Sequence, residues 1–241
     1  TMKALLCITA AITMMICNPA KSLAADAYWL DELVAFYYLT TFQLDNQFKA
    51  MKAKGAKTLL LHSDDLANPI LSYIAWRAKE AADLKTTLWI QWPNLHNLRR
   101  VSDVKGVQAV QVDDHFFANP PISLKDLKKQ LGEKELWCSY QPGQWSNYRS
   151  NICDKSDIQL YRQSCEGTIS NAYWLGITGR ADVAISTYHS GAQSDDASVD
   201  CISRKAQQYG NDVFVFKWAN TEAAVKELIR FIPSLEKYLI P

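Results

Sequence analysis

Residues 109–115 read AVQVDDH, a short apolar strand that ends abruptly in charged side chains. Val110 and Val112 have the parity expected of side chains that helices cover. The alternate positions then face the other side of the sheet, and they are Ala109, Gln111 and Asp113. In a (β/α)8 barrel, residues at the carboxyl ends of the strands form the functional face. This stretch therefore predicts both a buried parallel strand and a candidate site at its end.

Other runs along the chain are similar, because they are short, mostly apolar throughout, and rich in Val, Ile and aromatic residues. The predicted strands are 34–39, 58–63, 87–92, 109–114, 136–141, 158–163, 182–188 and 212–218. Helical spacing is found between or after them at 42–54, 69–83, 123–131, 198–209 and 221–231. This alternation predicts a compact, single-domain (β/α)8 TIM barrel. A doubly wound open sheet is the alternative, but the sequence has no G-x-G-x-x-G or Walker-type loop for a nucleotide.

Residues 1–24 are predicted to be a signal peptide, which leaves 25–241 as the barrel domain. Lys3 precedes a short apolar stretch over 4–17, and residues 22–24 (SLA) fit a small-x-small cleavage site. Retention as an N-terminal anchor is the alternative, although the apolar stretch is short for a membrane span. We therefore expect a secreted or periplasmic protein with no stable membrane span after processing.

The charge and composition narrow the range of partners. The formal net charge is +1 for the whole chain and −1 without the predicted signal peptide. A near-neutral chain lacks the electrostatic footprint for nucleic acid or anionic lipid, so no nucleic acid partner is expected. The eight Trp and eleven Tyr suit a carbohydrate-facing protein, although large cores also use aromatic residues. Nothing in the sequence indicates the oligomeric state.

Four cysteines follow the predicted cleavage site, namely Cys138, Cys153, Cys165 and Cys201. In an oxidising compartment they predict one or two disulfides, for which three pairings exist. We favour Cys165–Cys201, because both residues lie near the predicted strand-end face. A zinc site is disfavoured, because no C-x-x-C pair is present.

Polar and aromatic residues gather where the predicted strands end. Those expected to bind substrate are His62, Trp92, His115, Tyr140, Tyr161, Arg162, Tyr188, His189 and Trp218. Three tryptophans are candidate stacking platforms for sugar rings, or else pack in the core or at the rim: Trp92, Trp145 and Trp218. The opposite strand ends begin with residues that we interpret as solvated turns, such as Lys57, Lys85, Glu135, Asp157 and Asp212. This asymmetry predicts a single functional face.

Asp113 is the sharpest catalytic candidate on this face. A carboxylate at the inner end of a barrel strand is where a nucleophile or a general acid or base lies. In the alternative interpretation, Asp114 caps the following turn and Asp113 binds a neighbouring backbone group or Arg162. On strand 158–163 the same parity places three further side chains inside the barrel, namely Gln159, Tyr161 and Gln163.

Two short blocks carry a resemblance to a known family. V-D-D-H-F at 112–116 and Q-L-Y-R at 159–162 resemble the D-D-H-F and Q-x-Y-R motifs of the bacterial glycosyl-hydrolase-like family ten barrels. The resemblance implies a TIM barrel with a carbohydrate substrate or ligand. It further implies a glycoside hydrolase that cleaves an envelope or extracellular polysaccharide.

On this basis Asp113 is expected to act as nucleophile or base. A glycosidase needs two carboxylates roughly 5 to 9 Å apart, and the second stays open among Asp64, Asp65, Asp114 and Glu166. One alternative is a non-catalytic carbohydrate-binding barrel. Another is a metal-dependent hydrolase that uses His62, Asp113, His115 and His189. We expect no cofactor and no metal site, because the first strand lacks the H-x-H spacing usual in metal-dependent barrels.

Overall fold

A computed structural model describes residues 25–147, 151–161, 177, 179–186, 196–216, 218, 226–227 and 229–230. The predicted signal peptide, residues 1–24, lies outside these ranges. Across the described ranges, no helix combines the length and the apolarity needed to cross a membrane.

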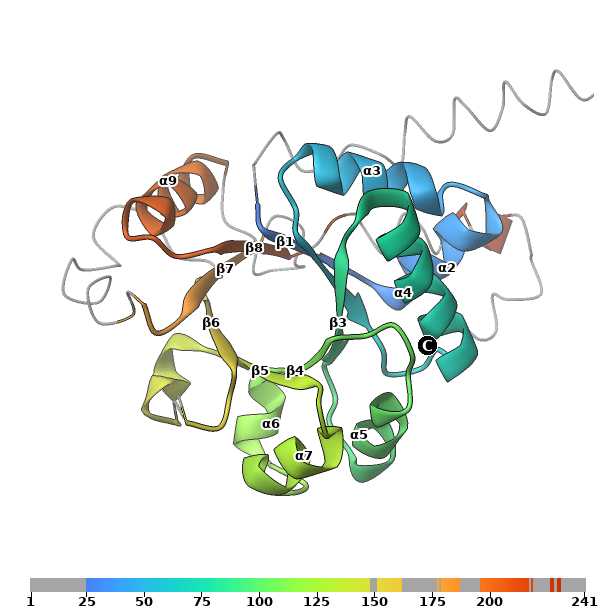
Figure 1. The fold of residues 1–241 in the computed structure, drawn as a ribbon. Coiled ribbons are helices and arrows are strands. Elements are labelled where there is room, and N and C mark those ends of the chain that lie inside the picture. Colours follow the sequence, from blue (N-terminus) through green and yellow to red (C-terminus); the bar gives the residue numbers. More distant parts are fainter. Residues whose placement is uncertain are drawn as a thin grey trace, which may run out of the picture.

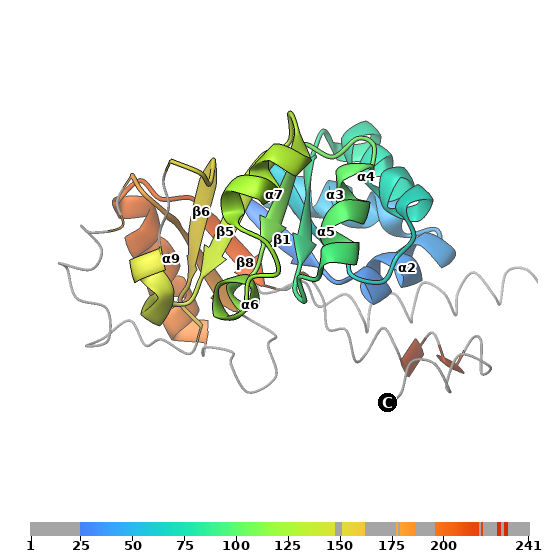
Figure 2. The same ribbon diagram turned by 90° about the horizontal axis from the view of Figure 1, so that it is seen from below.

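Parallel strands close into a barrel in sequence order, and the last strand pairs back with the first (Figure 1). The strands are β1 Ala27–Leu30, β2 Thr58–His62, β3 Lys85–Ile90, β4 Ala109–Val112, β5 Glu135–Tyr140, β6 Lys155–Gln159, β7 Asp182–Ser186 and β8 Val213–Phe216. The helices are α2 Glu32–Thr40, α3 Leu44–Ala53, α4 Asn68–Ala82, α5 Leu95–Ser102, α6 Asp114–Ala118, α7 Leu124–Leu131 and α9 Asp196–Gln208, with the 3₁₀ helix η1 Pro142–Asn147. Figure 2 shows helices flanking the strands on the outside. The (β/α)8 prediction is confirmed.

The strands separate two apolar clusters. An inner cluster fills the barrel with Ala27, Trp29, Leu60, Trp89, Ala109, Trp137, Ala184, Phe214 and Phe216. The outer cluster lies between the strands and the helices and includes Val110 and Val112. The parity predicted for β4 is therefore correct. At the centre, the Trp29 ring makes edge contacts with Phe214 and Phe216, with centroids 5.8 and 5.9 Å apart.

The first predicted strand, 34–39, is wrong, because these residues lie in helix α2. An apolar run of this length fits a buried helix as well as a buried strand, and periodicity alone does not separate the two. The decisive feature is Asp31, whose side chain accepts a hydrogen bond from the Leu33 N–H at 2.9 Å and caps the helix. The true first strand is the fully buried β1. Consequently Tyr37 and Tyr38 do not lie at a strand end.

Most other boundaries agree with prediction to within two residues, but β6 begins earlier than the predicted 158–163. The earlier start places Asp157 inside β6, where it is 1% exposed. The interpretation of Asp157 as part of a solvated turn is therefore wrong. The predicted helix 221–231 is described at 226–227 and 229–230, which are helical.

Asp157 belongs to a chain of polar side chains that runs through the barrel. Its carboxyl oxygens accept hydrogen bonds from Gln111 Nε2 at 2.5 Å and Ser139 Oγ at 2.7 Å. Gln111 in turn accepts a bond from Trp29 Nε1 at 3.1 Å. Burial raises the pKa of Asp157 well above its ordinary value. The barrel thus buries a carboxyl group beneath its strand-end face, and this burial favours the protonated form.

Replacing Asp157 with Asn should raise the melting temperature at pH 7 by a few degrees. A carboxyl whose pKa is raised by folding stabilises the fold at low pH and loses that contribution as the pH rises above its unfolded value. An amide of the same shape has no such penalty, and it can donate to Ser139. The gain should therefore be absent at pH 4, as calorimetry at both pH values would show. A loss of stability at pH 7 would contradict the raised pKa of Asp157.

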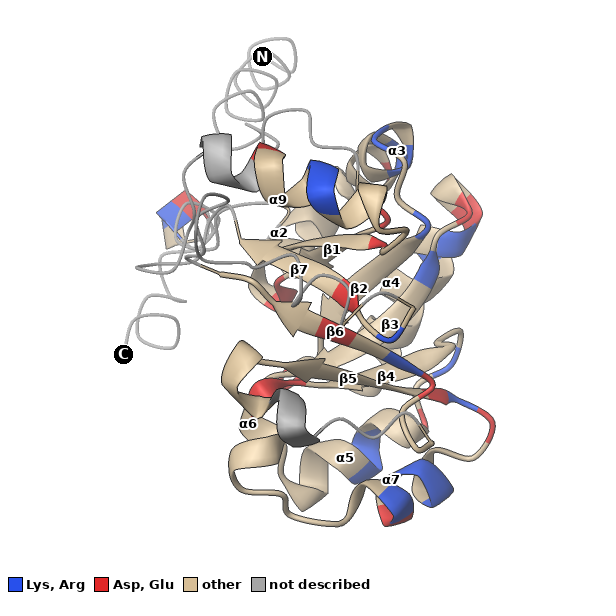
Figure 3. Ribbon diagram, turned by 90° about the vertical axis from the view of Figure 1, so that its left-hand side faces the viewer, with Lys and Arg blue, Asp and Glu red and all other residues tan. Residues whose placement is uncertain are grey.

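One disulfide lies within the described residues, joining Cys138 and Cys153. Cys201 is disulfide-bonded too. Its favoured partner, Cys165, lies outside the described residues. Figure 3 shows Lys and Arg interspersed with Asp and Glu along the described elements, in keeping with the near-neutral net charge.

Candidate functional site

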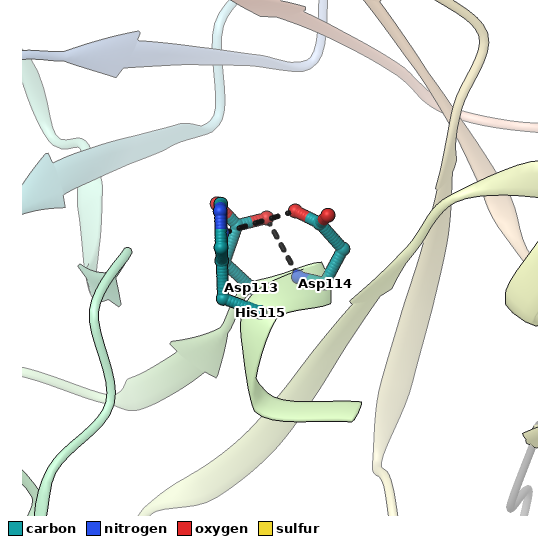
Figure 4. A group of neighbouring side chains, drawn as sticks. All are labelled: Asp113, Asp114 and His115. Carbon is teal, nitrogen blue, oxygen red and sulfur yellow. Dashed lines mark hydrogen bonds and ion pairs between the residues drawn. The ribbon is translucent and has the colours of Figure 1, made fainter. Parts of the chain in front are cut away.

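Asp113 and Asp114 lie where β4 passes into helix α6 (Figure 4). Asp113 is the N-cap residue of α6, and its Oδ1 accepts the Asp114 N–H at 2.9 Å. The alternative interpretation, in which Asp114 caps the turn, is therefore wrong, because the cap is Asp113. Both residues are buried, at 5 and 6% exposure.

Two glutamine side chains hold this pair of carboxyl groups. Gln159 Nε2, at the end of β6, donates to Asp113 Oδ1 at 2.5 Å and lies 3.0 Å from Ser139 Oγ. Gln141, just after β5, donates its amide to Asp114 Oδ2. Gln159 Nε2 also lies 3.4 Å from Asp114 Oδ1, so its amide contacts both carboxyl groups. Asp113 Oδ2 and Asp114 Oδ1 lie near His115.

The Asp114 carboxyl has an unusual proton affinity. Burial raises its pKa to about 6, and both the charge of Asp113 and a hydrogen bond with it add to the shift. His115 and Gln141 act in the opposite direction. A pKa of about 6 means that the Asp114 carboxyl gains or loses its proton close to neutral pH.

His115 lies at the rim beside this pair. Its Nδ1 is 3.5 Å from Asp114 Oδ1 and 3.8 Å from Asp113 Oδ2, which are ion-pair distances and not those of short hydrogen bonds. Interaction with Asp113 raises its pKa, burial lowers it, and the charges of Asp114 and Asp64 raise it further, with a net increase. The half-exposed Trp92 ring packs on the imidazole at 4.1 Å. The carboxyl pair thus favours the charged form of His115.

A second histidine is locked below the rim. His62, at the end of β2, lies between Glu32 Oε1 at 3.1 Å and Asp64 Oδ2 at 3.2 Å. Burial opposes the charge of His62, but hydrogen bonds and charges from Asp64 and Glu32 outweigh it and raise its pKa to about 10. Asp64 Oδ2 also accepts the Trp92 N–H at 2.9 Å. His62 therefore holds Asp64, which positions the Trp92 backbone.

Arg100 of helix α5 fixes the loop after β2. Its guanidinium donates to the backbone carbonyls of Ser63, Asp64 and Leu66. On the other side of the loop, Glu32 accepts the N–H groups of Asp65 and Leu66, each at 2.9 Å. The loop that supplies Asp64 is thus held from both sides.

Two predicted substrate contacts point away from this site. Tyr140 belongs to the outer cluster, stacks on Phe117 at 4.3 Å and lies 3.6 Å from Cys153 Sγ. Trp218 is 2% exposed and donates its indole N–H to Gln47 at 2.9 Å. Neither prediction fits the structure, because both side chains pack between the strands and the helices. Tyr161 does point inward, as predicted, and stacks on Phe216 at 5.7 Å.

Several predicted site residues lie outside the described residues: Arg162, Gln163, Glu166, Tyr188 and His189. The Trp145 side chain does so as well. The described part of the site is therefore the part that β1 to β6 supply.

Sequence reasoning missed Glu32 and gave Gln141 no role in the site. Glu32 was missed because the first strand was predicted at 34–39. The true first strand, β1, ends at Leu30, so Glu32 lies close to its carboxyl end. Gln141 is the last residue of the predicted strand 136–141, but its partner Asp114 is 27 positions away in sequence. Amide–carboxylate contacts of this kind leave no local signal.

Asp113, Asp114 and His115 also form the group of described side chains with the spacing of metal ligands. Their donor atoms lie within 4.8 Å of one another. Three of the four carboxyl oxygens already accept glutamine N–H groups, Asp114 Oδ1 through a longer contact of 3.4 Å with Gln159 Nε2. The same side chains can also bind protons, so the donor set alone does not favour a metal.

No family model matches the sequence, and no curated protein is similar to it. The resemblance to the glycosyl-hydrolase-like family ten barrels therefore stays a prediction. Among solved structures, two variants of the tryptophan synthase α-subunit from Pyrococcus furiosus match 90% of the chain. One covers 94% of the subunit with 12% identity and a TM-score of 0.53. The other covers 96% with 13% identity and a TM-score of 0.50.

A further match is 2,3-dimethylmalate lyase, a member of the PEP mutase/isocitrate lyase superfamily. It covers 97% of this chain and 89% of the lyase, with 11% identity and a TM-score of 0.45. At 12 and 13% identity, the two tryptophan synthase matches show the barrel fold alone.

The predicted glycoside hydrolase is wrong on these comparisons, because the matching barrels with TM-scores of 0.50 and 0.53 are tryptophan synthase α-subunits and not glycosidases. They give no support to a carbohydrate ligand either. The geometry agrees with this correction. Asp113 and Asp114 lie side by side, with donor oxygens within 4.8 Å, whereas a glycosidase places its carboxylates on either side of the scissile bond. Of the described alternative partners, Asp64 is bound to His62 and to the Trp92 backbone, and Asp65 is exposed.

Proposed function

We propose that this chain is an enzyme that moves a proton at a carbon atom next to a carbonyl group, as lyases and isomerases do. The observation that carries the proposal is the buried Asp113–Asp114 pair, in which the pKa of Asp114 is raised to about 6. A general base works best when its pKa lies near the pH at which it operates. The pair meets this requirement.

The base has an electrophilic partner in His115. Removing a proton next to a carbonyl group leaves negative charge on the carbonyl oxygen, and a fixed cation stabilises that charge. The raised pKa of His115 favours its cationic form beside the pair. The exposed Trp92 ring, packed on the imidazole, gives a small planar substrate a surface to contact. We therefore assign Asp114 as base, Asp113 as the charge that tunes it, and His115 as electrophile.

The proposal is tested by hydrogen exchange at carbon. The full-length protein is incubated in D₂O with a panel of 2-oxo acids, hydroxy ketones and simple aldehydes, and NMR follows loss of the C–H signal next to the carbonyl group. Exchange should occur with at least one compound. Its rate should rise as the pH increases through about 6, because Asp114 must lose its proton to act as the base. The absence of exchange across the panel would contradict the proposal.

A divalent cation at the same three side chains is a second candidate, favoured by their spacing. Metal analysis of the purified protein separates the two. A stoichiometric metal that is lost when Asp113 is replaced by Asn would overturn the proposal that Asp114 acts as a general base without a metal. Protein without metal that retains exchange would support it.

We also propose a secreted or periplasmic location. The bond between Cys138 and Cys153 supports it, because such bonds persist in oxidising compartments. Fractionation of cells that express the full chain would test the location.

A further inference from the structure

The outer surface over α2, α3 and α4 exposes aromatic side chains that the barrel does not need. Phe42, in the turn between α2 and α3, is 92% exposed. On α4, Tyr73 and Trp76 are 45 and 48% exposed, with their rings 5.5 Å apart. The three helices lie together on one side of the barrel in Figures 1 and 2. We call the surface of Phe42, Tyr73 and Trp76 the aromatic patch.

Phe42 occupies this position at a cost to the fold. Its φ is +58°, a left-handed conformation that bulky residues rarely adopt and that glycine adopts freely. Strain of this kind persists where the surrounding structure or a function requires it. The Phe42 ring gains little from the core, because it is almost fully exposed. Both observations point to a ring that is kept for contact with another molecule.

A groove of about 290 Å³ runs beside the patch, lined by Leu39, Phe42, Leu44, Asp45, Tyr73 and Arg77. Its two charged residues neutralise each other, because Arg77 binds both carboxylate oxygens of Asp45, with the Nε–Oδ1 contact at 2.9 Å. The Arg77 guanidinium also lies 5.0 Å from the Trp76 ring centre. The groove therefore has no unpaired charge to match on an occupant. An uncharged occupant fits it.

The size of the patch favours a narrow occupant. From the exposed fractions, its three rings offer about 400 Å² of surface. A stable dimer buries about 800 Å² per partner. A second copy of this chain would thus need contact surface well beyond the patch, whereas a single extended segment would not.

We propose that the aromatic patch and its groove bind an extended, proline-rich segment of a partner protein in the polyproline II conformation. Such segments dock in grooves lined by aromatic rings, and they carry solvated carbonyl groups that make no hydrogen bonds within the segment. Within the described part of the chain, the Tyr73 hydroxyl and the Trp76 indole N–H bond no protein group, so both can donate to those carbonyls. This interaction is independent of the proposed catalytic function.

The test is titration of the full-length protein with an oligoproline peptide of about ten residues, followed by calorimetry and by NMR of the tryptophan side chains. A Gly/Ser peptide of the same length is the control ligand. The oligoproline should bind in the micromolar range and shift the Trp76 indole signal. Replacing Trp76 with Ala should weaken binding by at least about tenfold.

The variant Phe42→Gly separates loss of binding from loss of folding, because it is expected to be at least as stable as the wild-type protein. The substitution relieves the left-handed backbone and should raise the melting temperature while weakening the peptide about tenfold or more. Leu95→Ala, which removes an exposed apolar side chain outside the groove, should leave binding unchanged. Failure of the wild-type protein to bind oligoproline would overturn the proposal. Binding that is unchanged in both the Trp76→Ala and the Phe42→Gly variants would also overturn it. So would a finding that the wild-type protein dimerises or binds vesicles and that these two substitutions abolish that behaviour.

Discussion

Replacing His62 with Leu is expected to lower the free energy of unfolding by about 3 to 5 kcal/mol. The substitution leaves Glu32 and Asp64 as buried carboxylates, with side chains 4 and 7% exposed, and removes the cation between them. Urea unfolding followed by circular dichroism at pH 7 measures the loss. The matched control is the triple variant Glu32→Gln, His62→Leu, Asp64→Asn, which should recover part of the stability because no uncompensated charge stays buried. A loss below about 1 kcal/mol for the single variant would contradict this expectation, because it would show that the ion pairs of His62 contribute no more than surface ion pairs do.

The pH dependence of this effect has a definite sign. Folding raises the pKa of His62 from 6.5 to about 10. Its contribution to stability is therefore complete below about pH 6.5 and disappears as the pH rises towards 10. The difference between the wild-type protein and the His62→Leu variant should shrink over the same range. A difference that stays constant up to pH 10 would show that the ion pairs are not its source.

Replacing Asp114 with Asn is expected to reduce the exchange rate at carbon by about 10²- to 10⁴-fold, the usual contribution of a general base. The fold should survive, because an amide can keep the hydrogen-bonding place next to Asp113. NMR in D₂O with the most reactive compound of the panel measures the loss. A rate within about threefold of the wild-type value would remove Asp114 from the reaction.

The contrasting variant is Asp113→Asn. It removes the negative charge that helps to raise the pKa of Asp114, so the pH at which exchange half-develops should fall below about 6. Direct NMR titration of the carboxyl carbons gives the same quantity without a substrate. If Asp113→Asn leaves the titration of Asp114 unchanged, the charge of Asp113 does not raise the Asp114 pKa.

The sequence was sufficient for features that depend on local pattern. Strand β4 combines an apolar outer face with polar inner positions, so its parity and its carboxyl end could be predicted from seven residues. The same alternation placed Gln159 and Tyr161 inside the barrel. Tyr140 shows what happens when parity is ignored. It was assigned to the site by its position at the strand end, although the inward side chains of β5 are Trp137 and Ser139.

Features that depend on distant partners could not be predicted. The apolar run at residues 34–39 fits a strand and a helix equally well. The cap at Asp31 decides in favour of the helix. The burial of Asp157 depends on Gln111, which lies 46 positions earlier in the sequence. Glu32 becomes a site residue because His62 lies across the strand end from it. In each case the polar group can be buried because it forms a hydrogen bond or an ion pair with a residue from another strand or loop.

The tryptophans inside the barrel and the one at its rim have a practical consequence for spectroscopy. Trp29, Trp89 and Trp137 lie inside the barrel, shielded from water, whereas Trp92 stands at the rim against His115. Fluorescence from the interior indoles should be blue-shifted and should change when the barrel opens. Trp92, next to an imidazole that gains and loses charge, should respond to quenchers and to molecules arriving at the strand-end face. The protein therefore carries separate optical reporters for its integrity and for the occupancy of its site.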